Sequence, residues 1–249
     1  MNAPVLAVDA LRKSFGGVRA VNDVSFTVAQ GEMLALIGPN GAGKSTCFNM
    51  VGGQLRPDGG AVALLGRSIG GLPSRAICRL GVGRTFQITE TFASMTVREN
   101  VQMALIARAR HVWRFWRPAA REGADDAARL LAQVGLEGQA ERAAGVLAYG
   151  DLKRLDLAMA LANEPRLLLM DEPTAGMAPA ERGALMRLTR ALARERGLAV
   201  LFTEHDMDVV FGIADRILVL NRGELIASGD AEDIRSDPRV REVYLGPEA

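Results

Sequence analysis

The chain has 249 residues, 49% hydrophobic and 24% charged, which is enough apolar material for a core of ordinary size. Its 30 basic and 29 acidic side chains leave a formal charge of +1, which excludes a global electrostatic field favouring nucleic acid or an acidic membrane surface. Two cysteines, Cys47 and Cys78, form neither a disulfide framework nor a metal-binding spacing.

Membrane-spanning and export signals are both missing from the sequence pattern. No apolar run approaches the roughly eighteen residues of a membrane span, and the first residues lack a basic region followed by an apolar one. We therefore expect a protein that serves any membrane process from the aqueous, reducing side.

The first third of the chain predicts mostly strands. Short alternating segments separated by turn residues run from Val5 to Ile37, which indicates a strand-rich N-terminal sheet. The turn signal of residues 57–60 precedes a strand over 61–65, and a strand over 82–86 leads into Gln87.

The middle of the chain predicts helices. From about residue 96 to residue 162 apolar residues follow helix spacing, as at Val97, Val101 and Leu105 and again over 127–134. We expect a helical subdomain inserted into an α/β body.

The last third returns to alternating strands and helices. Apolar strands over 167–170, 199–203 and 217–220 alternate with helices after Pro179 and from Asp206. This order predicts a mostly parallel sheet covered on both faces.

One glycine-rich segment carries the clearest chemical signal. Residues 38–46 match G-x-x-x-x-G-K-[ST], with an apolar strand before them (33–37) and a helical segment after them (45–51). Backbone amides of such a loop converge on phosphates, Lys44 reaches the terminal phosphates, and the Ser45 hydroxyl can ligate Mg²⁺. A chance glycine-rich turn would not explain this setting. The predicted nucleotide-binding residues are Gly38, Pro39, Asn40, Gly41, Ala42, Gly43, Lys44, Ser45 and Thr46.

Two carboxylates follow the apolar strand 167–170. A protein with a phosphate-binding loop needs an acid here to hold the water shell of Mg²⁺, and we assign Asp171 to that role. Glu172 points the other way from the strand end, so it is the candidate general base. The alternative is an acid pair that caps a helix beginning near Pro173.

With these motifs in order, the chain resembles the ATP-binding subunits of ABC transporters nearly from end to end. The resemblance implies that Gln87 contacts Mg²⁺ and water, and that Phe15 stacks on adenine with Val21 lining the same pocket. It also implies that His205 contacts the γ-phosphate. Taken singly, a surface glutamine, a core phenylalanine and a structural histidine remain alternatives.

Residues 147–151, Leu-Ala-Tyr-Gly-Asp, lie where the family carries its signature loop. The resemblance implies that Ala148, Tyr149 and Gly150 face ATP bound by a partner subunit. Ala148 replaces a serine, and losing one hydroxyl contact costs on the order of 1 kcal/mol. Asp151 replaces a glutamine and would repel phosphate, so we expect it to face away from the nucleotide.

Further departures indicate a particular branch of the family. Ala178 replaces an acid that crosses the dimer interface in many relatives. The signature, the Ala-Gly-Met segment 175–177, the run 204–207 and the tail 237–246 together resemble the ATPases of branched-chain amino-acid importers. In that group two ATPases pair beneath two permeases, which receive solute from a periplasmic binding protein.

The segment from Arg108 to Arg121 carries five arginines among Trp113, Phe115 and Trp116. Such a mixture can stack on bases or lie at a membrane surface, where it would abut lipid headgroups or the membrane subunits. A solvated insert whose aromatic side chains pack on neighbouring helices explains it equally well.

The resemblance implies an α/β fold of the P-loop NTPase class, with the core and an antiparallel subdomain in about residues 1–90 and 163–249 and the helical subdomain in about 91–162. It implies an ATP- and Mg²⁺-dependent importer ATPase, peripheral on the cytoplasmic face of the cell membrane, for branched-chain amino acids or a related solute. A lipid or lipopolysaccharide export ATPase is one alternative, and a soluble ABC ATPase acting on nucleic acid or ribosomes is another. The transported solute and the choice between homodimer and heterodimer stay open.

Overall fold

A six-stranded sheet forms the centre of the molecule. The structure is a computed structural model that describes residues 3–85, 91–109 and 123–245. The strand order is β10-β9-β3-β8-β7-β6, and every neighbouring pair is parallel except the antiparallel pair β9–β10. The strands are β3 (Met33–Ile37), β6 (Val82–Thr85), β7 (Leu167–Asp171), β8 (Ala199–Thr203), β9 (Arg216–Asn221) and β10 (Glu224–Gly229).

Helices and a second sheet cover this sheet. All residues of β3 and β8 are buried, as expected for parallel strands packed on both faces. The covering helices are α1 (Lys44–Val51), α6 (Pro179–Arg196) and α7 (Met207–Ile213). The second sheet is antiparallel in the order β2-β1-β4-β5, with β1 (Leu6–Phe15), β2 (Val18–Val28), β4 (Gly59–Leu64) and β5 (Arg67–Ser68); the short α2 (Ser74–Arg79) follows it.

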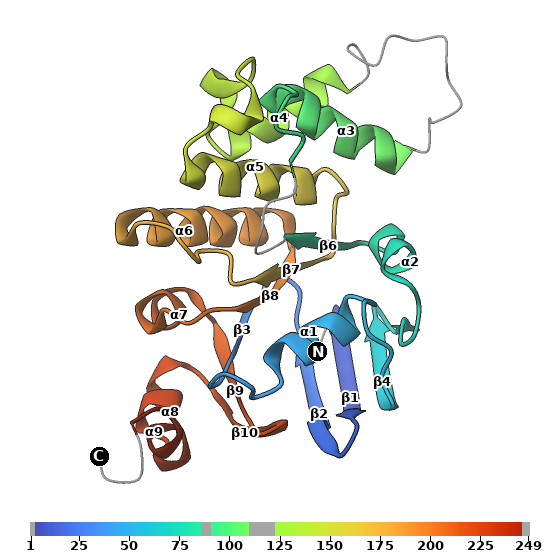
Figure 1. Ribbon diagram of the computed structural model, residues 1–249, viewed down its shortest axis with the longest axis vertical. Helices are drawn as coiled ribbons and strands as arrows, with labels where there is room; N and C mark the ends of the chain where they lie inside the picture. The colour runs from blue at the N-terminus through green and yellow to red at the C-terminus, as the bar shows by residue number, and fades with distance from the viewer. Residues whose placement is uncertain (1–2, 86–90, 110–122, 246–249) are drawn as a thin grey trace.

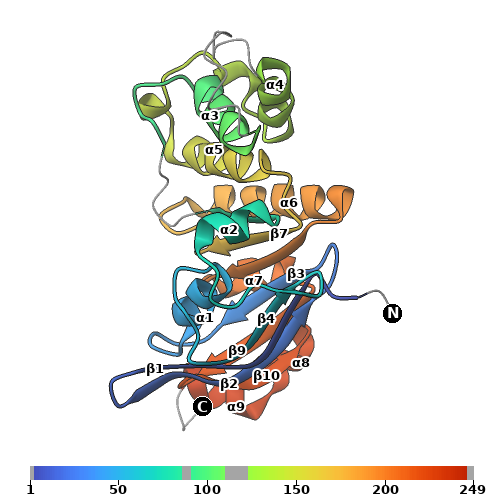
Figure 2. The same cartoon turned by 90° about the vertical axis from the view of Figure 1, so that its right-hand side faces the viewer.

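The helical segment lies at one end of the molecule, beyond α6 (Figures 1 and 2). It contains α3 (Val97–Ala109), α4 (Ala124–Gln133) and α5 (Tyr149–Leu161), with short 3-10 turns over Glu137–Gln139 and Ala144–Val146. α5 contacts both α3 and α4 on one side and α6 on the other, so it joins this segment to the sheet body.

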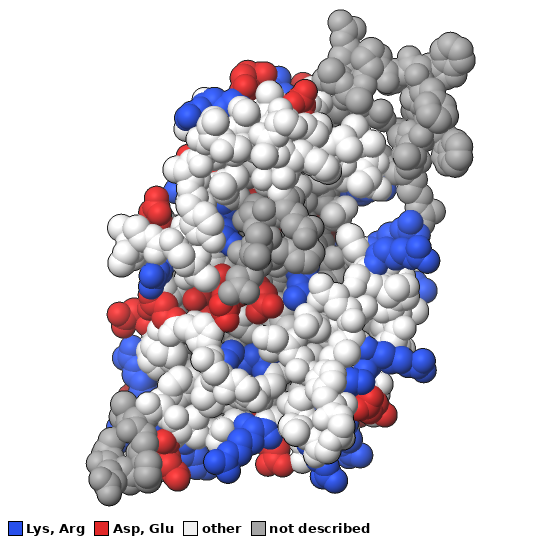
Figure 3. Space-filling model, in the orientation of Figure 1, with Lys and Arg blue, Asp and Glu red and all other residues white. Residues whose placement is uncertain are grey.

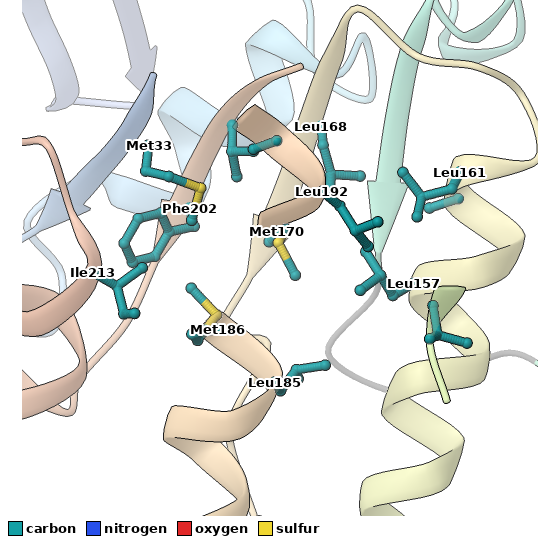
Figure 4. Packing of buried hydrophobic residues seen from close by; sticks show 14 of the residues in the cluster. Met33, Leu157, Leu161, Leu168, Met170, Leu185, Met186, Leu192, Phe202 and Ile213 are labelled. Carbon is teal, nitrogen blue, oxygen red and sulfur yellow. The ribbon is translucent and has the colours of Figure 1, made fainter. Parts of the chain in front are cut away.

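Two hydrophobic clusters hold the layers together because successive side chains of a buried strand point to opposite faces. Met33, Ala35 and Ile37 of β3 belong to the cluster under α5, α6 and α7, whereas Leu34 and Leu36 belong to the cluster with α1 and the antiparallel sheet. Figure 4 shows the first cluster, where Met170, Met186 and Phe202 converge from β7, α6 and β8.

The C-terminal part of the chain packs beside β9 and β10. It contains α8 (Ala231–Ser236) and α9 (Pro238–Leu245). Asp230 caps α8 by accepting hydrogen bonds from the amides of Glu232 and Asp233, and the Asp230 amide donates to Asp233 Oδ2 at 3.3 Å. In the described part of the chain, no helix has the length and apolarity to cross a bilayer.

The α/β fold with its mostly parallel sheet and separate antiparallel sheet confirms the predicted fold class. The strands expected at 33–37 and 199–203 have those bounds, and the helix expected from Asp206 begins at Met207 with Asp206 as its N-cap. The two cysteines are free, and burial raises the pKa of the Cys47 thiol to about 12, so Cys47 packs within α1 as a neutral apolar side chain.

Candidate nucleotide-binding site

The glycine-rich loop joins the end of β3 to the start of α1. Gly38 has a φ of 154°, and a Cβ there would lie 2.2 Å from the backbone oxygen of Leu220. Gly43 is the left-handed N-cap of α1, and a Cβ there would lie 2.3 Å from the backbone oxygen of Ala20. Only glycine fits these two positions, so the loop can approach β9 and β2 and still turn its amides toward a ligand.

Backbone hydrogen bonds fix one side of the loop, and its other side is exposed to solvent. The Gly223 amide, in the turn between β9 and β10, donates to the Ala42 oxygen at 2.9 Å, and the Ala42 amide donates to the Pro39 oxygen at 3.1 Å. Ala42 is buried, whereas Asn40, Gly41 and Ser45 are exposed and Pro39 and Thr46 are half-buried. The loop is therefore fixed at Ala42 and accessible to a ligand at Asn40, Gly41 and Ser45.

Lys44 bends back over its own loop. Its Nζ donates to the Gly38 oxygen at 2.7 Å and to the Pro39 oxygen at 3.0 Å. Burial lowers the pKa of Lys44, while the charges of Glu172 and Asp171 oppose that shift. The ammonium thus lies between carbonyls and two acids, where anionic phosphate oxygens would be better partners than neutral carbonyls.

Asp171 and Glu172 end β7 and face different partners. Asp171 Oδ1 accepts from the Thr203 hydroxyl at 2.8 Å, and its Oδ2 lies 3.5 Å from Arg84 Nη2. Glu172 has a φ of 47°, an uncommon conformation for a residue with a side chain, and its amide donates to Thr203 Oγ1 at 3.0 Å. One buried hydroxyl therefore fixes both acids.

Glu172 turns toward His205. Glu172 Oε1 and His205 Nε2 are 2.7 Å apart, and the histidine side chain is 51% exposed. The alternative in which Asp171 and Glu172 cap a helix is wrong, because residues 172–178 form turns and extended backbone and α6 begins only at Pro179. The Glu172 carboxylate, whose side chain is 24% exposed, instead lies beside the histidine.

The loop after Glu172 is tied to the loop after β8. Glu204 is 5% exposed, and its Oε1 accepts from the Thr174 amide at 2.9 Å and from the Thr174 hydroxyl at 2.6 Å. Arg182 Nη1 donates to Asp206 Oδ2 at 2.8 Å and holds the pKa of that carboxyl below its usual range. These bonds fix the relative positions of Glu172 and His205.

The two predicted adenine-pocket residues behave differently. Phe15, at the tip of β1, is 50% exposed with Lys13 Nζ 5.6 Å from its ring centroid, so it is not a core residue. Val21 is 1% exposed and packs within the cluster around α1. Apolar neighbours enclose the Val21 side chain, which supports β2 from within the core, and its place beside adenine stays a prediction.

The signature residues lie at the start of α5. Ala148 is the N-cap of this helix, and Tyr149 is exposed. A Cβ on Gly150 would lie 3.1 Å from a Glu181 carboxylate oxygen, and a Cβ on Gly176 would lie 3.3 Å from the Tyr149 ring. Tyr149 and Gly176 thus pack against each other.

Acidic side chains gather across the middle of one face, beside α7 and the ends of β7 and β8 (Figure 3).

Gln87 lies outside the described residues, as do residues 110–122 with most of the arginine-rich segment. Arg108, at the edge of that segment, pairs with Glu164 and donates to the Ala162 oxygen at 3.3 Å.

Comparison with known proteins decides the family. A family model described as ABC transporter matches residues 21–175, and one described as branched-chain amino acid ATP-binding cassette transporter matches residues 224–246. The chain belongs to the ABC transporter family. It is 43% identical to the high-affinity branched-chain amino acid transport ATP-binding protein LivG of Salmonella typhimurium and 42% identical to BraF of Pseudomonas aeruginosa, each over 99% of both chains.

Solved structures agree with this ABC cassette. The ADP conformation of MJ1267, an ATP-binding cassette of an ABC transporter, superimposes with a TM-score of 0.88 and 32% identity, covering 98% of this chain and all of that one. A nucleotide-free cassette gives a TM-score of 0.85 at 31% identity, covering 97% and 99%. The predicted relationship to ABC ATP-binding subunits is confirmed.

The motifs did not predict the roles of three residues that support the site. Thr203 fixes both acids, Glu204 fixes the following loop, and Arg84 lies against Asp171. Thr203 and Glu204 adjoin His205 in sequence, which was the available signal. Arg84 gave no signal because its partners come from distant parts of the chain.

Proposed function

We propose that this ABC cassette is the ATP-hydrolysing, energy-coupling subunit of an importer for branched-chain amino acids or a related small solute. The observation that carries the proposal is the arrangement of Lys44, Asp171 and Glu172 around one loop, with His205 2.7 Å from Glu172. LivG and BraF, which align with this chain over 99% of their length, are named as branched-chain amino acid transport proteins, and this supports the solute class.

The residues present fit a Mg²⁺ ion bound with the nucleotide. Asp171 supplies a carboxylate with an exposed fraction of 21%, and Ser45 supplies an exposed hydroxyl; both are the hard oxygen ligands that Mg²⁺ prefers. Among the residues that the structure describes, no group of three or more His, Cys, Asp and Glu is placed to hold a metal by itself. Shared ligation with phosphate oxygens, water and Gln87 matches that sparse donor set. When bound, the ion would neutralise charge on the phosphates.

The chain's own residues account for the remaining chemistry. The amides of residues 38–46 and Lys44 bind the phosphates and stabilise developing charge, while Phe15 stacks on the base. Glu172 accepts a proton from the attacking water, and His205 orients Glu172 and faces the terminal phosphate. Proton acceptance by a carboxylate fixed through its backbone amide needs little reorganisation.

The site is complete only with a second ATPase. Ala148, Tyr149 and Gly150 begin α5 at a distance from the chain's own loop, so we assign them to nucleotide held by a partner, either a second copy or a sister subunit (Figure 1). A dimeric structure of the cassette MJ0796 with ADP and Pi, which superimposes with a TM-score of 0.76 at 27% identity, supports this arrangement.

We assign the permease contact to a cavity between the sheet body and the helical segment. It has a volume of about 370 Å³ and is bounded by α2, β6, α3, α5, β7 and the segment directly after α1; its lining includes Gln54, Ile77, Arg84, Ala104 and Met159. The mainly apolar lining suits a helix from a membrane subunit. The cassette would then act peripherally on the cytoplasmic face, with the periplasmic binding protein contacting only the permeases and no nucleic acid involved.

Affinity purification of the tagged chain from gently solubilised membranes, followed by mass spectrometry, tests the proposal. Two polytopic permeases and a second ATPase encoded with a solute-binding protein are expected. Ribosomal, nucleic-acid-binding or lipid-export components in their place would overturn the importer assignment and leave the ATPase chemistry standing.

A further inference from the structure

Arg84 connects the nucleotide site with the cavity assigned to the permease. It lies on β6, and its side chain is only 15% exposed. Nη2 donates to Asn49 Oδ1 at 3.0 Å, and Nη1 bonds to Gln54. The guanidinium carbon lies 5.7 Å from the centroid of the Phe48 ring. Three of its contacts therefore belong to α1 or to the segment directly after it.

The same guanidinium reaches the acid at the end of β7. Arg84 Nη2 lies 3.5 Å from Asp171 Oδ2, while Asp171 Oδ1 is held by Thr203. Burial lowers the pKa of Arg84 and the charge of Asp171 opposes that shift, so the carboxylate favours the charged guanidinium in a poorly solvated place. A separation of 3.5 Å is a loose pair that a competing cation can disturb.

Arg84 also forms part of the wall of the 370 Å³ cavity, together with Gln54, Asp156 and Met159. A displacement of its guanidinium changes the shape and the charge of that wall. The one side chain therefore touches the P-loop helix, the acid at the end of β7 and the surface that faces a partner.

We propose that Arg84 is a positioning residue that couples the charge state around Asp171 to the permease cavity. Without a divalent cation, Asp171 keeps the guanidinium 3.5 Å from its Oδ2 while the same group bonds to Asn49 and Gln54. When Asp171 shares a cation with the nucleotide, like charges repel, so the guanidinium moves away from Asp171 and keeps its contacts with Asn49 and Gln54 at the cavity wall. The cavity is then altered only when the nucleotide site is loaded. The Asp171 part rests on the geometry above, and the permease part rests on the proposed function.

Two binding measurements test this link without relying on turnover. The first is binding of a fluorescent ATP analogue to the purified chain as a function of Mg²⁺ concentration, and the second is association with the solubilised permeases at saturating nucleotide. Arg84→Gln removes the competing charge. The Mg²⁺ concentration that gives half-maximal analogue binding should therefore fall by about threefold or more. Its permease association should weaken by about threefold or more, because the cavity no longer responds.

Matched variants separate the two effects. Arg84→Lys keeps the positive charge and should keep the wild-type Mg²⁺ dependence, although it loses the forked contact with Asn49 and Gln54. Asn163→Ala changes the same cavity away from Asp171 and should weaken permease association without moving the Mg²⁺ dependence.

Unchanged Mg²⁺ dependence in Arg84→Gln would remove the link to Asp171. A shifted Mg²⁺ dependence with wild-type permease association would remove the coupling. If the unmodified chain binds no permease, the proposed function fails on its own, and the Mg²⁺ measurement still decides whether Arg84 and Asp171 interact.

Discussion

Replacing Thr203 with valine tests whether one buried hydroxyl holds both acids of the nucleotide site. Thr203 is 1% exposed; its hydroxyl donates to Asp171 Oδ1 at 2.8 Å and accepts from the Glu172 amide at 3.0 Å. Valine has nearly the same shape but neither hydrogen-bonding function. At about 0.5–1.5 kcal/mol for each lost bond, Thr203→Val should reduce the free energy of unfolding by roughly 1–3 kcal/mol.

The effect on turnover should exceed the effect on folding. Glu172 has a strained backbone with φ at 47°, and its amide loses the bond to Thr203, so the carboxylate loses its fixed position. We expect kcat to fall by about tenfold or more, because misplaced catalytic groups are costly. Urea unfolding and phosphate release measure the two effects.

Thr203→Ser is the matched control, since it keeps the hydroxyl and loses only a methyl group. It should retain most of the activity and lose about 1 kcal/mol of stability. Equal kcat values for the valine and serine variants would refute the role given to the hydroxyl.

Three further predictions concern the loop, the signature helix and the acid after β8. Gly38→Ala should destabilise the nucleotide-free chain more than Gly41→Ala does in urea unfolding, because a Cβ at Gly38 would lie 2.2 Å from a backbone oxygen, whereas a Cβ at Gly41 has no neighbour within 4 Å among the described atoms; equal losses would contradict the packing. Asp151→Gln should leave ATPase activity within a few fold, and a large gain would show that the acid opposes dimer closure. Arg182 depresses the pKa of Asp206, so that carboxylate adds stability above its unfolded pKa of about 3.9 and loses it as the pH falls through the lower folded value. Arg182→Met should therefore lose less stability than the wild type between about pH 6 and pH 2 in acid-unfolding measurements, and parallel curves would dismiss the ion pair.

Local patterns predicted the central elements of the fold because those elements are governed by local physics. β3 and β8 are uninterrupted apolar runs because both of their faces are buried. The spacing of the glycines and of Lys44 within residues 38–46 predicts the phosphate-binding loop. Asp206 precedes α7 as its N-cap, so the start of that helix could also be predicted from the sequence.

Elements that depend on distant neighbours were not predictable in the same way. β10 alternates weakly, and among the described strands it pairs with β9 alone, so its place as an antiparallel edge became visible only in the sheet. The resemblance implies that Val21 lines the adenine pocket, but the burial of its side chain became visible only with the register of β2.

The candidate site shows the same division. Lys44, Asp171 and Glu172 follow from motifs, whereas the contact of Arg84 with Asn49, Gln54 and Asp171 joins segments that are 30 to 87 residues apart. The roles of the motif residues toward nucleotide remain predictions that solution experiments must test.

The most direct test of the account is ATP hydrolysis by the purified chain with its Glu172→Gln variant beside it. Glutamine keeps the size of the side chain and an oxygen for His205 but cannot accept the proton from water. Loss of a general base should lower kcat by about 10²–10⁴-fold, which corresponds to roughly 3–5 kcal/mol of barrier. Binding of the fluorescent ATP analogue should persist within a few fold. A variant that hydrolyses ATP at the wild-type rate would contradict the assignment of Glu172 as the base.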